Sequence, residues 1–153
     1  MKITDFLKPQ GVITSLKSRD KTAALREMAE QLVASEPSLN AQKVFQVLLE
    51  REKISTTAIG EGVAIPHGKL SGAPRVVALF ARSPEGIDFT SLDGSPTYLF
   101  FVLIAPEDAA ADHLKALARI SRLLKDPVFR QQLMARKTRQ EIFDLIVAED
   151  QKF

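Results

Sequence analysis

The chain carries two histidines, His67 and His113, and theirs are the side chains whose chemistry stands out. An imidazole titrates near pH 7, so it can act as an acid, a base or a nucleophile under physiological conditions. The chain contains no cysteine, which excludes disulfides and thiolate ligands. Two widely separated histidines without a cysteine match no zinc-ligand spacing, so we expect neither a metal nor another cofactor.

His67 lies in the glycine-rich stretch ISTTAIGEGVAIPHGK. Gly60, Gly62 and Gly68 permit backbone angles and close approaches that a side chain would block. Pro66 fixes its own φ and keeps the preceding residue extended. We therefore expect a short strand that runs into a stiff, exposed turn holding His67. The alternative is a surface-turn histidine without a function.

Two nucleotide-binding motifs share features with this stretch, and both fail. A G-x-x-x-x-G-K-[ST] loop needs a hydroxyl after its lysine for magnesium, and four residues lie between its glycines. Here five residues lie between Gly62 and Gly68, and Leu70, which has no hydroxyl, follows the lysine. The dinucleotide motif G-x-G-x-x-G fails because Ile65 stands at its third glycine position.

The run AIGEGVAIPHGK resembles the phosphorylation-site motif of IIA components of the bacterial phosphoenolpyruvate-dependent phosphotransferase system, of the fructose/mannitol type. The resemblance covers almost the whole chain, and the opening 1–32 looks closest to the nitrogen-regulatory branch of that family. One departure is Ala58, where relatives usually carry glycine. Segments at familiar distances from the motif are LEREK (49–53), GIDF (86–89), LDG (92–94) and the pair His113-Leu114.

The resemblance implies roles for individual residues. His67 would accept a phosphoryl group, and His113 would correspond to the second active-site histidine. Backbone N–H groups of the loop containing Gly60, Gly62 and Gly68 would help to hold the phosphoryl group. Without the resemblance, His113 is a boundary residue on an apolar helix stripe.

Arg51 has two open interpretations. It stands at the end of an expected helix, where a cation complements the helix dipole by about 0.3–1 kcal/mol. The resemblance favours a contact with the phosphoryl group or with a partner protein.

The function implied by the resemblance is that of a phosphohistidine carrier. It would accept phosphate from an HPr-like protein, expected to be the nitrogen-branch paralogue, and contact regulatory or potassium-transport proteins. The alternative is a sugar-specific IIA component that passes phosphate to a fructose or mannitol IIB domain.

The composition limits the class of protein. With 153 residues, 45% hydrophobic and 26% charged, the chain should form a single domain over 1–153. A net charge of +2 is too mild to indicate nucleic-acid binding. Neither a signal-peptide core nor an apolar run of about 18 residues occurs, so we expect a cytoplasmic protein without membrane insertion.

Hydrophobic periodicity predicts an α/β protein. Two segments that are apolar on both faces, 75–82 and 97–105, must be interior strands, and they need helices on both faces of a mixed sheet. A turn is expected over 83–88 between them, and a short strand over 11–16. Helices are expected over 22–34, 41–51 and 109–125, and then from Pro127 and from the capping box at Thr138. The expected N-caps are Asp20 for the first helix, Asn40 for the second and Asp126 before Pro127.

The long helix over 109–125 is expected to bury one stripe of residues. That stripe contains His113, Leu117, Ile120 and Leu124, widened by Leu114 and Ala118. A basic stripe of Lys115, Arg119 and Arg122 should form its solvated outer face.

Overall fold

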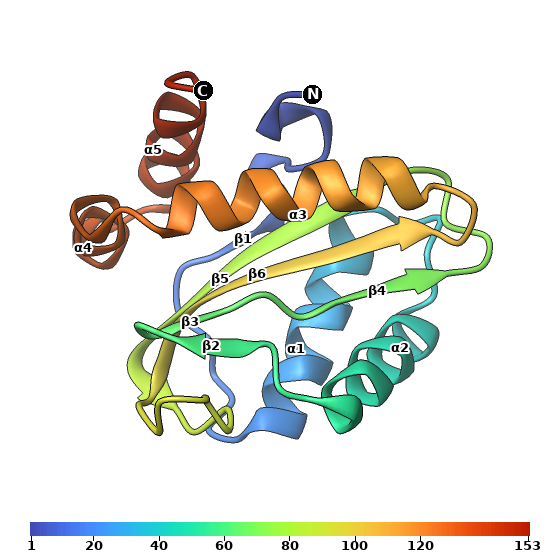
Figure 1. Ribbon diagram of the computed structural model, residues 1–153, viewed down its shortest axis with the longest axis horizontal. Coiled ribbons are helices and arrows are strands. Elements are labelled where there is room, and N and C mark those ends of the chain that lie inside the picture. The colour runs from blue at the N-terminus through green and yellow to red at the C-terminus, as the bar shows by residue number, and fades with distance from the viewer.

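A six-stranded mixed sheet forms the centre of the computed structural model, which describes residues 1–153 (Figure 1). The strand order is β1-β5-β6-β3-β2, and β4 pairs with β6 beyond β3. The strands are β1 (Val12–Ile13), β2 (Ala58–Gly60), β3 (Val63–Ala64), β4 (His67–Leu70), β5 (Val77–Ile87) and β6 (Thr97–Pro106).

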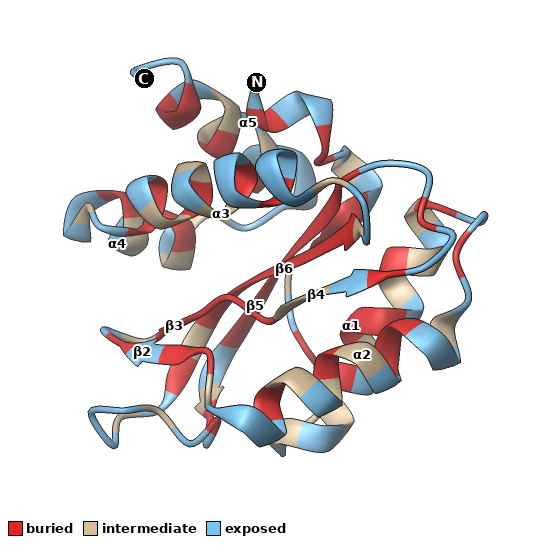
Figure 2. Ribbon diagram, turned by 45° about the vertical axis from the view of Figure 1, so that its right-hand side comes forward, coloured by how far each residue is buried: buried red, intermediate tan, exposed pale blue.

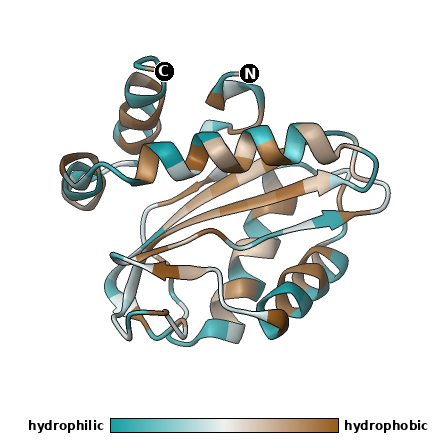
Figure 3. Cartoon of the chain, viewed as in Figure 1, coloured by the Kyte–Doolittle hydropathy of each residue, from teal (hydrophilic) through white to brown (hydrophobic).

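The long central strands β5 and β6 are antiparallel, while β1, β3 and β4 are each parallel to their central neighbour. Both central strands consist mostly of hydrophobic residues, as Figure 3 shows in brown. Phe80 lies opposite Phe101, and the two rings meet edge to face at 5.6 Å between centroids. Strands that are apolar on both sides must be covered on both sides, because exposing either face would leave hydrophobic surface in water.

Five α-helices supply that cover. Their N-caps are Asp20, Asn40, Asp126 and Thr138 for four of them, and each cap side chain accepts a bond from a backbone N–H of the first turn. A cap of this kind stabilises a helix by about 1 kcal/mol. The helices are α1 (Lys21–Ser35), α2 (Ala41–Ile54), α3 (Ala110–Leu124), α4 (Pro127–Ala135) and α5 (Arg139–Asp150), with 3₁₀ turns η1 (Ile3–Asp5) and η2 (Pro9–Gly11) near the N-terminus.

The helices divide between the two faces of the sheet, α1 and α2 on one and α3 to α5 on the other (Figures 1 and 2). The two resulting cores contain 22 and 21 buried residues, so neither face dominates the burial. The predicted α/β fold, with a mixed sheet flanked by helices on both faces, is confirmed. None of the helices is both long enough and apolar enough to cross a membrane.

Three details differ from the expectations. The turn over 83–88 is wrong, because β5 continues to Ile87 and pairs with Thr97 after a register shift. Leu114 and Ala118 do not widen the buried stripe of α3, since Leu114 is 68% exposed and Ala118 is also exposed; Ala116 and Leu123 are buried there instead. The basic stripe is only partly solvated, because Arg119 forms an ion pair with Asp150 and Arg122 stacks over the Phe153 ring.

Candidate functional site

His67 is the first residue of β4, so the expected exposed turn is wrong. Strands β3 and β4 run along the same edge of β6, where Val63 pairs with Leu99 and His67 with Leu103. Between them, the buried Pro66 accepts a hydrogen bond at its carbonyl from the Leu103 N–H, 2.9 Å away. The proline keeps the chain extended, and the free edge of β6 then captures it as a strand. This pairing leaves His67 half-buried.

The ring of His67 has a defined hydrogen-bond partner. Its Nδ1 lies 2.7 Å from the carbonyl oxygen of Ile65. A carbonyl can only accept, so Nδ1 carries the hydrogen and Nε2 keeps its lone pair. The geometry therefore fits the Nδ1–H tautomer, which leaves on Nε2 the lone pair that a nucleophilic histidine requires.

His113 approaches this ring from the first turn of α3. The ring centroids are 5.6 Å apart and the ring planes are inclined by 70°. The His113 side chain is buried, and its Nε2 has no hydrogen-bond partner. Buried polar atoms are nearly always paired, so an unpaired ring nitrogen beside a second histidine is a candidate position for binding an external group.

Burial holds the pKa of both histidines below the ordinary value. For His67, the positive charge of Arg51 lowers the pKa further, while the Ile65 hydrogen bond and the charge of Glu52 oppose the effect. For His113, burial lowers the pKa first, followed by the charges of His67 and Lys69. Both rings are therefore mainly neutral at pH 7, and the lone pair of His67 is available for attack.

Arg51 belongs to the last turn of α2. Its Nη1 donates to the carbonyl oxygen of Ser55 at 2.9 Å, as expected for a cation that completes a helix C-terminus. It is also near enough to His67 to affect the pKa of that ring. The capping role is observed, and a contact with a phosphoryl group stays a prediction.

The three glycines of the motif separate into two places. Gly68 follows His67 in β4 and packs against α2 so closely that an added Cβ would overlap with Val47 Cγ1. Gly60 and Gly62 lie in the β2–β3 hairpin with φ values of 115° and 74°. There the first faces Asp93 and the second faces Tyr98.

The predicted phosphate loop needs correction at Gly60 and Gly62. The carbonyl of Gly62 accepts from the Leu99 N–H, whereas His67 is in register with Leu103. Four residues of strand correspond to about 13 Å. The structure thus brings together His67, His113, Arg51 and Gly68, and leaves the other two glycines to shape the hairpin.

Sequence reasoning missed Glu52, whose side chain is only 2% exposed. It binds Lys21 and both polar groups of Thr57. A signal was present in the sequence, because Glu52 follows Val44 and Leu48 at intervals of four along the buried stripe of α2. A carboxylate at such a register position must find partners inside the protein.

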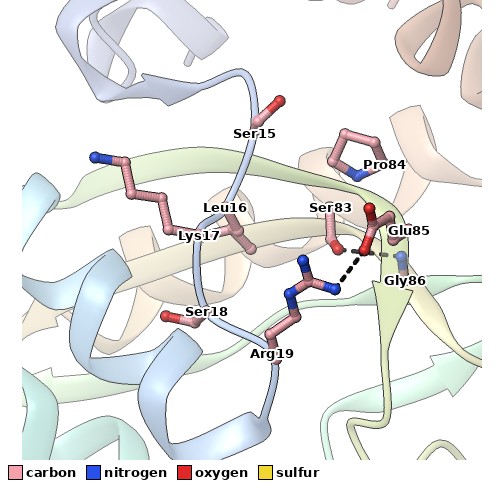
Figure 4. Close-up of a pocket in the computed structure, with 9 residues that line it drawn as sticks. All are labelled: Ser15, Leu16, Lys17, Ser18, Arg19, Ser83, Pro84, Glu85 and Gly86. Atoms are coloured by element: carbon pink, nitrogen blue, oxygen red, sulfur yellow. Dashed lines mark hydrogen bonds and ion pairs between the residues drawn. The ribbon is translucent and has the colours of Figure 1, made fainter.

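A polar cleft of about 410 Å³ lies at the other edge of the sheet, between the segment after β1 and the end of β5 (Figure 4). Arg19 Nη1 and Glu85 Oε2 pair across it at 2.6 Å, so the charge of Arg19 is already balanced. It holds neither histidine. No cluster of three or more potential metal-ligating side chains occurs anywhere in the chain.

The sequence also matches a known family. Residues 5–149 match the family described as the phosphoenolpyruvate-dependent sugar phosphotransferase system, EIIA 2. The chain belongs to this family of phosphotransfer components, as the motif around His67 indicated.

The relatives of the chain include nitrogen regulatory proteins. The nitrogen regulatory protein of Bradyrhizobium diazoefficiens is 49% identical over 146 residues, which cover 95% of each chain. The crystal structure of nitrogen regulatory protein IIA-Ntr from Neisseria meningitidis superposes with a TM-score of 0.87 at 30% identity, covering 94% of this chain and 98% of that one. The fructose-specific EIIABC component of Bacillus subtilis is 37% identical over 98% of this chain but only 24% of its own length. The likenesses to the two nitrogen regulatory proteins support the predicted place in the nitrogen-regulatory branch.

Proposed function

We propose that the protein is a phosphohistidine carrier that accepts a phosphoryl group on Nε2 of His67. The observation that carries this proposal is the pair of nitrogens at the site. Nδ1 of His67 is bound by the Ile65 carbonyl, which leaves Nε2 free, and the unpartnered Nε2 of His113 lies in the adjoining ring. A neutral nucleophilic nitrogen, on His67, and a polar nitrogen without a partner, on His113, therefore belong to neighbouring rings at this site.

The transfer requires no proton to move. The lone pair of His67 Nε2 forms a bond to phosphorus as the bond between phosphorus and the donor histidine breaks, and the donor imidazole leaves with that electron pair. Nδ1 keeps its hydrogen, so the ring becomes positively charged. The Ile65 carbonyl, 2.7 Å from Nδ1, stabilises that developing charge.

The negative charge of the phosphoryl group needs its own partners. Phosphoryl transfer proceeds through a loose transition state, so the protein mainly positions the group and neutralises its charge. A hydrogen on His113 Nε2 would donate to a phosphoryl oxygen, satisfying an atom that otherwise has no partner. The guanidinium of Arg51 would supply the positive charge, and its bond to Ser55 holds it at the end of α2.

The proposed donor is an HPr-like phosphocarrier. Two exposed apolar side chains near the site support a docking role, Ile54 at the end of α2 and Leu114 next to His113. They are 80% and 68% exposed, so both are available for contact with a partner. Charged groups around these two side chains would then set the orientation of the docked carrier more than its affinity.

We further propose that the output is regulatory, as in the nitrogen branch. The likeness to a nitrogen regulatory protein extends over 95% of both chains. Phosphorylation would add about −1.5 to −2 charges to this surface, by analogy with other phosphorylated side chains. It would thereby change which regulatory or potassium-transport proteins the surface contacts. The second candidate, transfer to a sugar-specific IIB domain, draws on the likeness to the fructose-specific component.

One experiment tests both the carrier function and the choice between the nitrogen and sugar branches. The protein is incubated with phosphoenolpyruvate, the first general enzyme of the system and either the nitrogen-branch or the sugar-branch HPr-like carrier, and acid-labile phosphate is followed over time. We expect label on His67 only, gained faster from the nitrogen-branch carrier. Label that persists in His67→Ala would refute the carrier proposal. Faster transfer from the sugar-branch carrier, with onward transfer to a fructose or mannitol IIB domain, would favour the second candidate.

A further inference from the structure

A buried carboxylate lies behind the site on the side facing α1. Glu52 Oε1 accepts from the Thr57 N–H at 3.0 Å, and Oε2 accepts from the Thr57 hydroxyl. Lys21 Nζ, from the first turn of α1, lies 2.9 Å from Oε1. All the polar atoms of this carboxylate are thus occupied inside the protein, which makes Thr57 a fixed point in the chain after α2.

Thr57 passes this constraint to His67. Its carbonyl oxygen accepts from the Ile65 N–H at 3.3 Å, and the Ile65 carbonyl in turn lies 2.7 Å from His67 Nδ1. The carbonyl that selects the tautomer of His67 therefore belongs to a residue whose own N–H is held by the segment that Glu52 anchors. Residues that follow α2 and residues that precede β4 are connected here by hydrogen bonds rather than by a shared strand.

Lys21 completes the arrangement from the other side. Its Nζ also donates to Thr90 Oγ1 at 2.6 Å and to the Phe89 carbonyl at 3.3 Å. The Thr56 hydroxyl binds the same Phe89 carbonyl at 3.0 Å. The ion pair therefore joins α1 and the loop after β5 to the segment that supports His67.

A purely structural role would not require a charge at this position. Burying an ion pair costs desolvation energy that its mutual attraction often fails to repay, and well-packed apolar residues stabilise such sites at least as well. The negative charge of Glu52 raises the pKa of His67, while the positive charge of Arg51 lowers it. A carboxylate here both orients the accepting carbonyl and favours positive charge on the ring.

We infer that Glu52 is a positioning residue for phosphoryl transfer, acting through Thr57 and Ile65 on the orientation and tautomer of His67. The inference rests on the proposed function only in that His67 is taken as the group that is phosphorylated. The effect of Glu52 on the imidazole of His67 exists whether or not a phosphoryl donor is present.

The test compares Glu52→Gln with Glu50→Gln, a control in which an exposed glutamate on the same helix loses its charge. Ring ¹⁵N and ¹H NMR of His67 is recorded against pH for both variants and for the wild type. For Glu52→Gln we expect a lower pKa of His67, because a nearby negative charge is gone, and a measurable population of the Nε2–H tautomer. The control should match the wild type.

The same variants are then assayed for transfer from the HPr-like carrier. A misplaced nucleophile should slow the transfer step of Glu52→Gln by about tenfold, with little change in the carrier concentration needed for half-saturation. Thr57→Val, which keeps the charge but removes the hydroxyl, gives an independent test if Glu52→Gln folds poorly. It should disturb the tautomer while leaving the pKa of His67 closer to that of the wild type.

The outcomes separate the two proposals. Unchanged pKa, tautomer and transfer rate within twofold in folded Glu52→Gln would overturn the positioning role, even if thermal stability falls. Failure of the wild type to accept phosphate from any carrier would overturn the carrier function instead, and the NMR comparison would still decide the role of Glu52.

Discussion

The two edges of the sheet follow the same plan and differ in how their polar groups are satisfied. At one edge β1 runs parallel to β5, and at the other β4 runs parallel to β6. Beside β1, the buried Arg82 donates to the carbonyls of Thr14, Leu133 and Arg136. At the β4 edge, by contrast, Nε2 of His113 has no partner.

This difference separates scaffold from site. A buried polar group without a partner costs about 1–3 kcal/mol, so a fold keeps one only where something else compensates. Arg82 satisfies the last carbonyls of α4 and fastens that helix to the sheet. The histidine pair has the opposite character, since Nδ1 of His67 is held while Nε2 of His67 and Nε2 of His113 are left for an external group. The same sheet therefore has a closed edge, where Arg82 is bonded to backbone carbonyls, and an open edge, where ring nitrogens of the histidine pair have no partner.

The largest effect should come from removing the Arg82 hydrogen bonds beside β1. Arg82→Met keeps most of the side-chain volume but leaves the carbonyls of Thr14, Leu133 and Arg136 without their donor. We expect the free energy of unfolding, measured by urea denaturation, to fall by about 3 kcal/mol. The rate of phosphorylation of the folded variant should stay within twofold of the wild type. A parallel loss of rate would show that the two edges are coupled.

The next effect concerns the open edge. His113→Ala removes an imidazole whose Nε2 makes no bond within the protein, so stability should change by only about 1 kcal/mol. The phosphoryl group would lose a hydrogen bond worth about 1.5–3 kcal/mol. Phosphorylation and dephosphorylation should both slow by about 10- to 100-fold. Ala118→Ser, at an exposed position of the same helix that has no part in the proposed docking surface, is the control for general effects on α3. Equal rates for His113→Ala and the wild type would leave His113 a structural residue.

A smaller effect should follow from filling the space between β4 and α2. A Cβ at Gly68 would overlap with Val47 Cγ1, so Gly68→Ala should destabilise the protein by about 1–2 kcal/mol. Adding Val47→Ala should recover part of this loss. At the β1 edge, Gly11→Ala meets the Ala78 carbonyl at 3.2 Å and should cost less. Urea denaturation of the four proteins checks this order, and a greater cost at Gly11 would reverse the comparison.

The smallest effect is a dependence of stability on pH. The pKa values of His67 and His113 lie below 6.5 in the folded protein, so the unfolded chain binds protons more readily as pH falls. The two histidines should therefore cost nothing well above pH 6.5 and destabilise the fold progressively as pH falls from 6.5 through their folded pKa values. The slope of unfolding free energy against pH in this window should be smaller in the double variant His67→Gln, His113→Gln. An identical slope would mean that other groups control it.

The sequence by itself determined the fold class and the helix caps, and it singled out His67 as the predicted reactive histidine. These depend on local properties: two doubly apolar strands demand cover on both faces, a side-chain oxygen before a helix satisfies free N–H groups, and the motif around His67 is contiguous. The N-caps at Asp20, Asn40, Asp126 and Thr138 formed as predicted for the same reason.

Only the tertiary structure decided what surrounds that histidine. The conversion of the expected turn into β4 depends on the free edge of β6, which is distant in the sequence. The meeting of His67 with His113 depends on how α3 crosses the sheet, and the separation of Gly62 from Gly68 depends on register along β6. The link from Glu52 to His67 depends on hydrogen bonds between segments that no local pattern pairs. Contacts of this kind follow from packing and strand register, which local propensities do not specify.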